Sequence, residues 1–571
     1  MTVPAWTSPA ERSLQVFEPL LPAERTVLRA AAAGEIAKIG YRRANPNFTE
    51  NHLRAEFVAM LMCGGAPDAA VAGRRLQIMG ATIVGRLDLT SMVVPLTAWW
   101  YRCSFVHIPH LDGTRVAGSL TFADCALPGL RAQASRIELD LELCSGCNVD
   151  GDVLLAHAQV GRTLSFERLQ LRAPTTAGAG GRRLVADGVQ VGGDVILSGG
   201  LEAMGEVRFE GARIGAHLRA DGARLVADVD ASGARGVALD LDRIHVHGNV
   251  LLDAGFAAAG QVRLQQARID GSLDCDGAMF DAVGDASWGD NAASLMLDDA
   301  AIGGALILRR LQAPLQGASL AHARVNVLCD DATTWGLHHV LDGFCYRQLG
   351  EHAPTDAAMR LEWLTGQAAS QLGAHFRPQP WRQLIDVLRH MGRDAEAREI
   401  AIERERQLRK VGRIGAGTSG LAHRVAEIGH DLFGWFAGYG HRPWRLLGWA
   451  GAVWLLCGCV YWAAAQDGAT EPPAWHRQAE PMLGGCPAAA PCAAPAFQPY
   501  LYSLELMVPL LHLQQVQAWA PARGARPGPV EAWLGAPWLQ MLTWMQSVFG
   551  WIVAMTLVAS VSGWADRDRR R

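Results

Sequence analysis

The sequence lacks the residues and motifs that would point directly to an activity. Its 571 residues include 52 Lys and Arg against 56 Asp and Glu, a net charge of −4, and only Lys38 and Lys410 are lysines. A balance this close to neutral excludes nucleic-acid binding driven by bulk positive charge. The chain also contains no G-x-S-x-G, Walker A or H-E-x-x-H motif, so serine hydrolase, P-loop nucleotide and zinc-protease chemistries have no sequence support.

A secretory signal is missing as well. The N-terminal stretch MTVPAWTSPAERSLQ has no basic segment followed by an apolar run, so we expect no export by that route. The body of the protein is then cytoplasmic, and its cysteines are expected to be mainly reduced thiols. The high Ala and Gly content is typical of a bacterium with a GC-rich genome.

Two long uncharged runs near the C-terminus predict membrane spans. The run from Leu446 to Ala465 contains no charged residue, and the run from Leu539 to Trp564 has only Gln540 and Gln546 as strongly polar residues. About 20 apolar residues cross ~30 Å of hydrocarbon as a helix, and both runs reach that length. The sequence therefore predicts a two-helix transmembrane module over 443–565; two buried core helices are the alternative.

The placement of arginine predicts the orientation of this module. Many Arg residues precede the first span and RDRRR ends the chain, whereas the loop 466–538 carries only Arg477, Arg523 and Arg526. The positive-inside rule puts both termini in the cytoplasm and the loop outside. We therefore expect a protein of the bacterial inner membrane. Within the loop, the spacing of Cys486 and Cys492 leaves open whether they form a disulfide.

One segment of the loop has two interpretations. Gln498 to Trp519 is too interrupted for a third span, so it is either re-entrant or an amphipathic stretch on the outer face, which we favour. Two spans around a re-entrant segment is the plan of simple cation channels, but the segment has no TVGYG-like filter. The GYG at 438–440 precedes the first span and is no filter.

Residues 73–330 carry a repeat that predicts a parallel right-handed β-solenoid. A branched residue, any residue, Gly, any residue and then Leu or Val recurs, mostly at a spacing of 33 and also at 22, 23 and 42, which indicates an underlying unit of about 11 residues. Short alternating strands of this kind bury a continuous apolar column only when they stack. A twisted β-sandwich is the alternative. We expect the shared glycines at corners, where positive φ or close approach of neighbouring coils is needed: Gly85, Gly118, Gly151, Gly193, Gly215, Gly248, Gly271 and Gly304.

Helical segments are predicted on both sides of the repeat. Residues 1–72 form an N-terminal helical cap, with one helix starting near Pro22 and a second whose apolar face holds Leu53, Phe57, Met60 and Leu61. Residues 336–411 form a helical hairpin that covers the open end of the solenoid. Its first helix places Trp381, Leu384, Ile385 and Leu388 on one face. A linker and membrane approach, 412–442, follows.

The candidate chemical motifs are weak, and each has a structural explanation. GAGTSG (415–420) matches G-x-G-x-x-G, but a charged helix precedes it and a membrane span follows, so it is predicted to be a linker and not a dinucleotide site. Cys144 and Cys147 form a C-x-x-C without a second pair. Cys457 and Cys459 are two residues apart in a helix and do not share a face. His245 and His247 point to one side of a strand but lack an evident third metal ligand. Asp274 and Asp276 are explained by a solvated strand face. No catalytic, cofactor-binding or metal residue is assigned.

The order of these segments resembles a family of bacterial membrane-anchored proteins with pentapeptide-repeat-like β-solenoids. LRAEFVAMLMCGG leading into GATIVGRLDL is similar to that family's entry into its solenoid, and AGYGHRPWR to its approach to the membrane. Members are often labelled membrane-associated oxidoreductases, yet the label brings no catalytic residue to this chain.

The sequence thus favours a non-enzymatic, membrane-anchored scaffold that presents a cytoplasmic solenoid to a protein partner. Its expected partners are the lipid bilayer and a protein on the solenoid face, with a homo-oligomer as an alternative and without nucleic acid. Two other functions stay open: a two-span oligomeric ion channel or gate regulated by the solenoid, and a membrane-associated oxidoreductase.

Overall fold

The computed structural model of the chain describes residues 13–45, 47–172, 182–229, 235–281, 293–373, 376–411, 443–466, 475–477, 496–521 and 538–568. These residues fall into two compact units, Met1–Ile400 and Ala401–Arg571. GAGTSG and the pair Cys486 and Cys492 lie outside the described residues, so the predictions made for them stay predictions.

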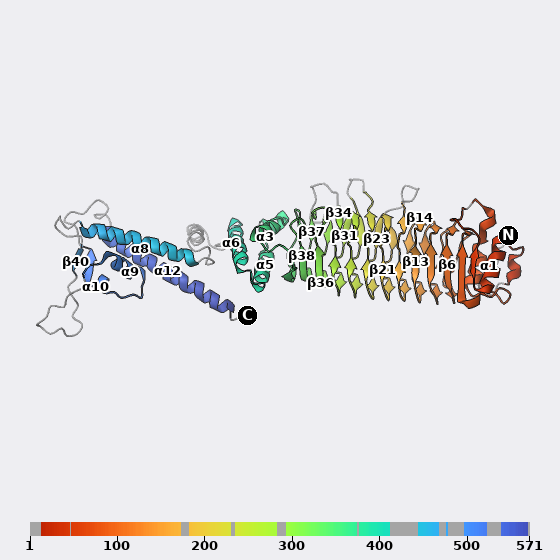
Figure 1. Cartoon of the computed structure of the whole chain (residues 1–571), viewed down its shortest axis with the longest axis horizontal. Coiled ribbons are helices and arrows are strands. Elements are labelled where there is room, and N and C mark those ends of the chain that lie inside the picture. The colour runs from red at the N-terminus through yellow and green to blue at the C-terminus, as the bar shows by residue number, and fades with distance from the viewer. Residues whose placement is uncertain are drawn as a thin grey trace. The chain divides into compact units, whose positions relative to one another are not determined.

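The first unit is built from short parallel strands in three long sheets (Figure 1). Strand β12 (Arg136–Ile137) pairs with β16 (Gln159–Val160), and β16 pairs with β20 (Gln190–Val191). Strands β13 (Leu141–Cys144), β14 (Asn148–Val149) and β15 (Val153–Leu154) likewise each pair with the strand four elements later. Four consecutive strands therefore form one layer, and successive layers stack in register.

Alternation of side chains explains why these strands stack. In β12, β16 and β20 the first residue faces outward and the second is buried, which is the period of two expected for a half-buried strand. The register then places one buried aliphatic residue above another along the sheet: Ile137, Val160, Val191, Ile214, Val246 and Ile269. Such a column buries apolar surface that no single layer could bury.

The strand register shows that one layer spans about two of the predicted 11-residue units. Register partners in adjacent layers usually stand 21, 22 or 23 positions apart along the chain, as in the pairs Arg115 with Arg136, Asn148 with Gln170 and Arg136 with Gln159. The spacing is longer where the segments 173–181, 230–234 and 282–292 are added to a layer of four strands. The repeating unit is thus one whole layer, with occasional additions.

The shared glycines are required mainly by close approach. Of the eight, only Gly85 has a positive φ, +92°. A Cβ atom on each of the other seven would lie under 3.0 Å from an atom of the neighbouring layer, for example from the carbonyl oxygen of Pro128 at Gly151. Many positive-φ turns are instead occupied by other residue types, such as Asp124 and Arg243.

The N-terminal region is helical only in part. Helix α1 (Pro22–Ala33) begins at Pro22 as predicted, and α2 (Ala55–Met62) buries Phe57, Met60 and Leu61. The prediction of helix throughout was wrong for two strands, β1 (Ile36–Lys38) and β2 (His52–Arg54), which pair with β3 (Arg75–Met79) and β4 (Thr82–Val84). Leu53 is therefore buried as part of strand β2 and not of a helix. Strands β1 and β2 extend the sheets by one layer.

At the other end of this unit, helices cover the last strand. Residues 336–411 were predicted to be helical, but β39 (Cys345–Leu349) still pairs with β38 (Arg324–Asp330). The described residues that follow form α3 (Ala357–Thr365), α4 (Ala369–Leu372), α5 (Gln379–His390) and α6 (Asp394–Lys410), and the first unit ends within α6, at Ile400. The predicted apolar face of α5 is buried.

Two glutamines of α5 bind the free edge of this strand region. Gln379 accepts a hydrogen bond from the Gly343 amide (2.9 Å) and donates one to the Phe344 carbonyl (3.0 Å). Gln383 donates to the Tyr346 carbonyl (2.6 Å). An edge strand otherwise presents unpaired backbone groups to other chains, so these side chains close the edge.

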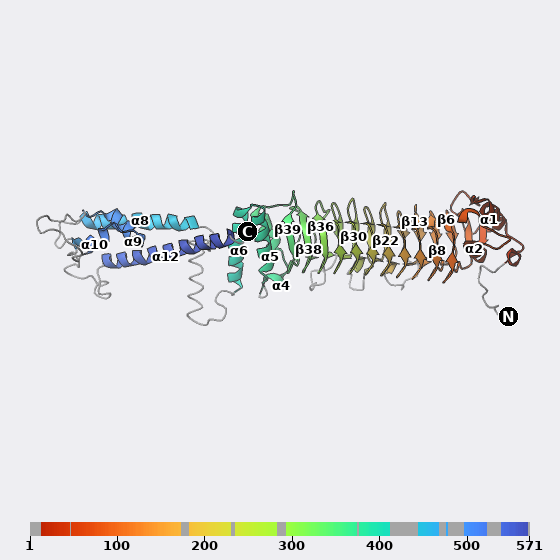
Figure 2. The same ribbon diagram turned by 90° about the horizontal axis from the view of Figure 1, so that it is seen from below.

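The second unit contains two long apolar helices, α8 (Pro443–Gln466) and α12 (Trp538–Asp568). Their segments Trp444–Ala465 and Trp538–Val558 are long and apolar enough to cross a membrane. A shorter helix, α9 (Pro499–Met507), packs against both, as Figures 1 and 2 show. Helix α10 (Gln515–Ala518) leads into β41 (Trp519–Pro521), which pairs with β40 (Trp475–Arg477).

Candidate functional site

The candidate site lies on the outer face of one ladder in the first unit. The ladder continues from β20 through β24 (Arg213–Ile214) and β28 (His245–Val246) to β32 (Arg268–Ile269). After each buried aliphatic residue, the next residue of the chain is exposed again. In successive layers these exposed positions hold Glu138, Gly161, Gly192, Gly215, His247 and Asp270.

Three of those positions are glycines, and they form the floor of an open groove. The groove has a volume of about 350 Å³, with Gln159, Gln190 and Arg213 beside the floor and Glu138 and His247 at its two ends. The glycines are needed because a Cβ at Gly192 would lie under 3.0 Å from the Gly161 carbonyl oxygen, and one at Gly215 equally close to that of Gly192. Close stacking thus leaves bare backbone facing solvent.

At one end of the groove, two histidines and an aspartate converge. Nδ1 of His247 lies 2.9 Å and Nε2 of His245 lies 3.4 Å from the same oxygen, Oδ2 of Asp270. The other oxygen, Oδ1, accepts a hydrogen bond from Nε of Arg268 (3.2 Å). Hydrogen bonds from His247 first, and then from Arg268, hold the pKa of Asp270 below its usual range.

The three side chains are open to solvent, with exposed fractions of 30% for His245, 59% for His247 and 38% for Asp270. Their backbone is nevertheless fixed, because Val246 and Ile269 beside them are buried and paired in register. The three side chains can therefore change rotamer while the paired backbone holds their Cα atoms in place.

Sequence reasoning found the two histidines but missed Asp270. The strand geometry confirms that His245 and His247 share one side. The third residue comes from the next layer and was identifiable from the repeat, because His247 and Asp270 both directly precede a shared glycine, Gly248 or Gly271. Equivalent positions of adjacent layers stack in this fold.

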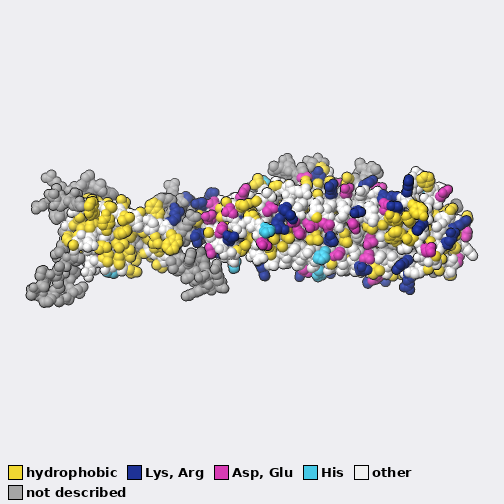
Figure 3. Space-filling view, viewed as in Figure 1, with side chains coloured by type: hydrophobic (Ala, Val, Ile, Leu, Met, Phe, Trp, Pro, Cys, Tyr) yellow, Lys and Arg dark blue, Asp and Glu magenta, His cyan; other side chains and the backbone are white. Residues whose placement is uncertain are grey.

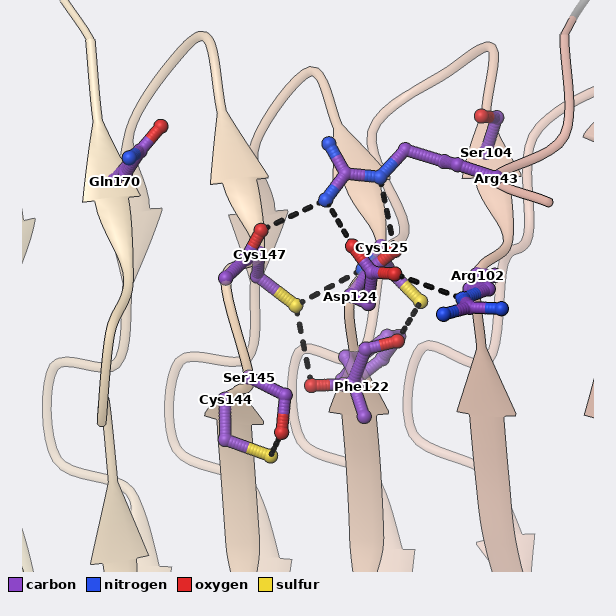
Figure 4. A network of polar contacts seen from close by, with 12 residues as sticks. Arg43, Arg102, Ser104, Phe122, Asp124, Cys125, Cys144, Ser145, Cys147 and Gln170 are labelled. Carbon is purple, nitrogen blue, oxygen red and sulfur yellow. Dashed lines mark hydrogen bonds and ion pairs between the residues drawn. The ribbon is translucent and has the colours of Figure 1, made fainter.

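The C-x-x-C pair does not form a site. Figure 4 shows Cys144 beside Ser145, whereas the sulfur of Cys147 faces the neighbouring strand. There it contacts the Phe122 carbonyl (3.1 Å) and accepts from the Cys125 amide (3.3 Å). The two thiols lie in different surroundings and are not directed at a common ligand, which agrees with the absence of a second C-x-x-C pair.

Cys147 instead belongs to a buried column with Cys125 and Cys103, which come from three successive layers. Burial raises the pKa of the Cys125 thiol well above its ordinary value, so it stays protonated. Next to this column, Arg43 binds Asp124 and the Gly146 carbonyl (Figure 4). The arrangement ties the N-terminal region to these layers and indicates a structural role.

The other predicted pairs also have structural roles. Asp276 forms ion pairs with Arg309 and Arg310, while Asp274 accepts a hydrogen bond from the Asp276 amide (3.0 Å). The hydrogen bond from Arg310 lowers the pKa of Asp276, which therefore stays charged and is unsuited to proton transfer. Cys457 is buried and Cys459 is exposed, so they do not share a face of α8, as predicted.

Comparison with known proteins gives no match: no family model, no curated protein and no solved structure matches the chain.

Proposed function

We propose that the protein is a membrane-anchored, non-enzymatic scaffold that presents a cytoplasmic β-solenoid to a protein partner. The groove floored by Gly161, Gly192 and Gly215 is the observation that carries this proposal. We also propose that the chain is related to the membrane-anchored pentapeptide-repeat-like proteins that its sequence resembles. Its elements are a solenoid, an anchor and a binding face.

The strand pairing supports a solenoid. Every strand of the ladder from β12 to β32 is parallel to its neighbours, and each neighbour comes from the preceding or following layer. A chain that winds through four short strands and returns to the same ladder produces this pattern. A β-sandwich, the alternative, is built from antiparallel strands.

The second unit supports an anchor through its inverted polarity. Polar side chains lie inside it: Gln546 is 2% and Ser503 is 0% exposed, and Gln546 donates to the Ser503 hydroxyl (2.7 Å) and accepts from the Tyr461 hydroxyl (2.8 Å). Large apolar side chains of α12, such as Met545, Trp551 and Met555, are exposed. Figure 3 shows that hydrophobic side chains cover much of the visible surface of this unit. Water would favour the reverse distribution, whereas lipid favours this one.

The groove fits an extended peptide segment that carries a carboxylate. Its floor offers backbone without side chains, so a second backbone can approach closely. Gln159 and Gln190 supply amides that both donate to and accept from a peptide, and the exposed guanidinium of Arg213 suits a carboxylate. A rigid surface of this kind binds without an ordering cost of its own.

Two measurements test the proposal on the full-length protein. A fluorescent protein fused to the C-terminus should fluoresce and an alkaline phosphatase fused there should be inactive, because the terminus is expected in the cytoplasm. Detergent extracts should retain a stoichiometric protein partner with the wild type and lose it with Gln190→Trp, which fills the groove. A protein that is alone in both extracts contradicts the scaffold.

A second candidate, an oligomeric channel or gate, is favoured by the position of α9. Trp454 of α8 donates to the Tyr500 carbonyl (2.9 Å), so α9 packs beside α8 from its first turn. The Gln498 amide donates to the Gln515 side chain (3.0 Å), so the chain returns next to its entry point. This favours the re-entrant interpretation of 498–519 over a stretch on the outer face.

The channel predicts a symmetric oligomer and ion flux in liposomes; a monomer with silent bilayers contradicts it. The oxidoreductase alternative gains nothing from the described residues, among which we identify no dinucleotide-binding turn. A colourless preparation that leaves NAD(P)H unchanged would remove it.

A further inference from the structure

We propose that His245, His247 and Asp270 form a binding site for a first-row divalent transition metal ion such as Zn²⁺. The ligand atoms are Nε2 of His245, Nδ1 of His247 and Oδ2 of Asp270. This proposal does not rest on the scaffold function, although His247 also lines one end of the groove.

The separations of the ligand atoms fit a metal ion. All three atoms lie within 4.8 Å of one another. Zinc binds nitrogen and oxygen ligands at about 2.0–2.2 Å with tetrahedral geometry, which places neighbouring ligand atoms ~3.3 Å apart. The observed separations from Oδ2, 2.9 Å to His247 and 3.4 Å to His245, are close to this value. Small rotations of exposed side chains would complete the site.

The fold fixes the direction of the ligands. His245 begins β28 and His247 directly follows it, and their rings lie on the same side, with centroids 4.4 Å apart, while Asp270 projects from the next layer. Arg268 binds Oδ1 of Asp270 and leaves Oδ2 for the metal. A hydrogen bond of this kind to the second carboxylate oxygen orients a ligand, as outer-shell partners do in protein metal sites.

The ligand set also determines the class of metal. Two imidazoles and one carboxylate suit Zn²⁺, Co²⁺ or Ni²⁺, whereas Mg²⁺ and Ca²⁺ prefer six or more oxygen ligands. Metal binding requires the lone pair on Nδ1 of His247, so its ring proton moves to Nε2 or is released. Three protein ligands leave a fourth position for water. The neighbouring guanidinium groups of Arg213 and Arg268 lower the affinity below that of closed four-ligand sites.

The test is a titration of the full-length protein in detergent with Zn²⁺ by calorimetry and with Co²⁺ by absorbance. The wild type should bind one Zn²⁺ that EDTA removes and that Mg²⁺ does not displace, and Co²⁺ should give a ligand-field spectrum. His245→Ala, His247→Ala and Asp270→Asn should each weaken binding at least tenfold.

His107→Ala, a change at an exposed histidine elsewhere in the same unit, is the matched control and should bind as the wild type does. The variants should keep their fold because the altered side chains are at least 30% exposed, which circular dichroism checks. The proposal is overturned if the double variant of His245 and His247 binds Zn²⁺ as tightly as the wild type, or if the wild type binds none.

Discussion

Loss of Arg360 is predicted to open the capped end of the first unit. Arg360 of α3 is 2% exposed and Asp330 at the end of β38 is 1% exposed. Their two hydrogen bonds measure 2.7 and 2.8 Å, Arg360 also donates to the Pro354 carbonyl (2.7 Å), and Trp335 donates to Asp330 (2.7 Å). In Arg360→Met the carboxylate stays buried and keeps only the Trp335 indole as a side-chain donor.

Removal of one partner from a buried ion pair costs about 3–5 kcal/mol. This cost should appear as faster hydrogen–deuterium exchange in peptides that cover β38 and α3, measured by mass spectrometry on the full-length protein. If these amides exchange through a shared opening, their protection should fall by roughly 10² to 10⁴-fold.

Two comparisons isolate the ion pair. Arg136 and Glu138 form a solvated ion pair, with side chains 57% and 52% exposed. Arg136→Met removes this pair and should lower the free energy of unfolding by only about 0.2–1 kcal/mol. The double variant Asp330→Leu with Arg360→Met replaces both charges by apolar groups and should recover most of the loss. Equal protection in Arg360→Met and Arg136→Met would refute the reasoning.

Three further predictions concern packing, pH and the apolar helices. Gly192→Ala should lower the free energy of unfolding by about 1–3 kcal/mol, because its Cβ would clash with the Gly161 carbonyl oxygen. Gly236→Ala, where the nearest atom to the added Cβ is 3.7 Å away, should lower it by under ~0.5 kcal/mol. Similar losses in thermal unfolding would contradict the stacking argument. Burial lowers the pKa of His339 from 6.5 to about 4, so the unfolded state takes up a proton at a higher pH than the folded state does. The free energy of unfolding should therefore fall by about 3 kcal/mol as the pH drops from 6.5 to 4. His339→Gln should reduce the difference in stability between pH 7 and pH 4.5, and an unchanged difference would argue against this role of His339. Gln546→Leu should destabilise the second unit by ~0.6–1.7 kcal/mol in detergent, as it removes the bonds to Tyr461 and Ser503, whereas Met545→Leu at an exposed position should have little effect; a reversed order would speak against the inverted polarity.

The sequence predicted best what local pattern determines. Alternation and the shared glycines indicated stacked strands, Pro22 marked the start of α1, and uncharged length identified α8 and α12. Boundaries were less certain, since β2 precedes α2 without a break and the apolar residue Leu53 suits either element.

Pairs between layers were harder to predict. Asp330 is the last residue of the predicted repeat region and Arg360 lies in a helix beyond it, so the shared glycines that align His247 with Asp270 do not relate these two residues. Segments added to three layers lengthen the spacing between stacked residues, so the stacking partner of a side chain cannot be obtained from a constant period. The shared glycines align His247 with Asp270, whereas other pairs between layers follow from the register, which the structure supplies.

The most direct test of the scaffold is photocrosslinking in intact cells. A photoreactive residue at Gln190, beside the glycine floor, is compared with one at Met204, which is exposed on another sheet. The account predicts one predominant crosslinked protein from position 190 and none from position 204. No crosslink from position 190, or the same products from both positions, would contradict a partner bound in the groove.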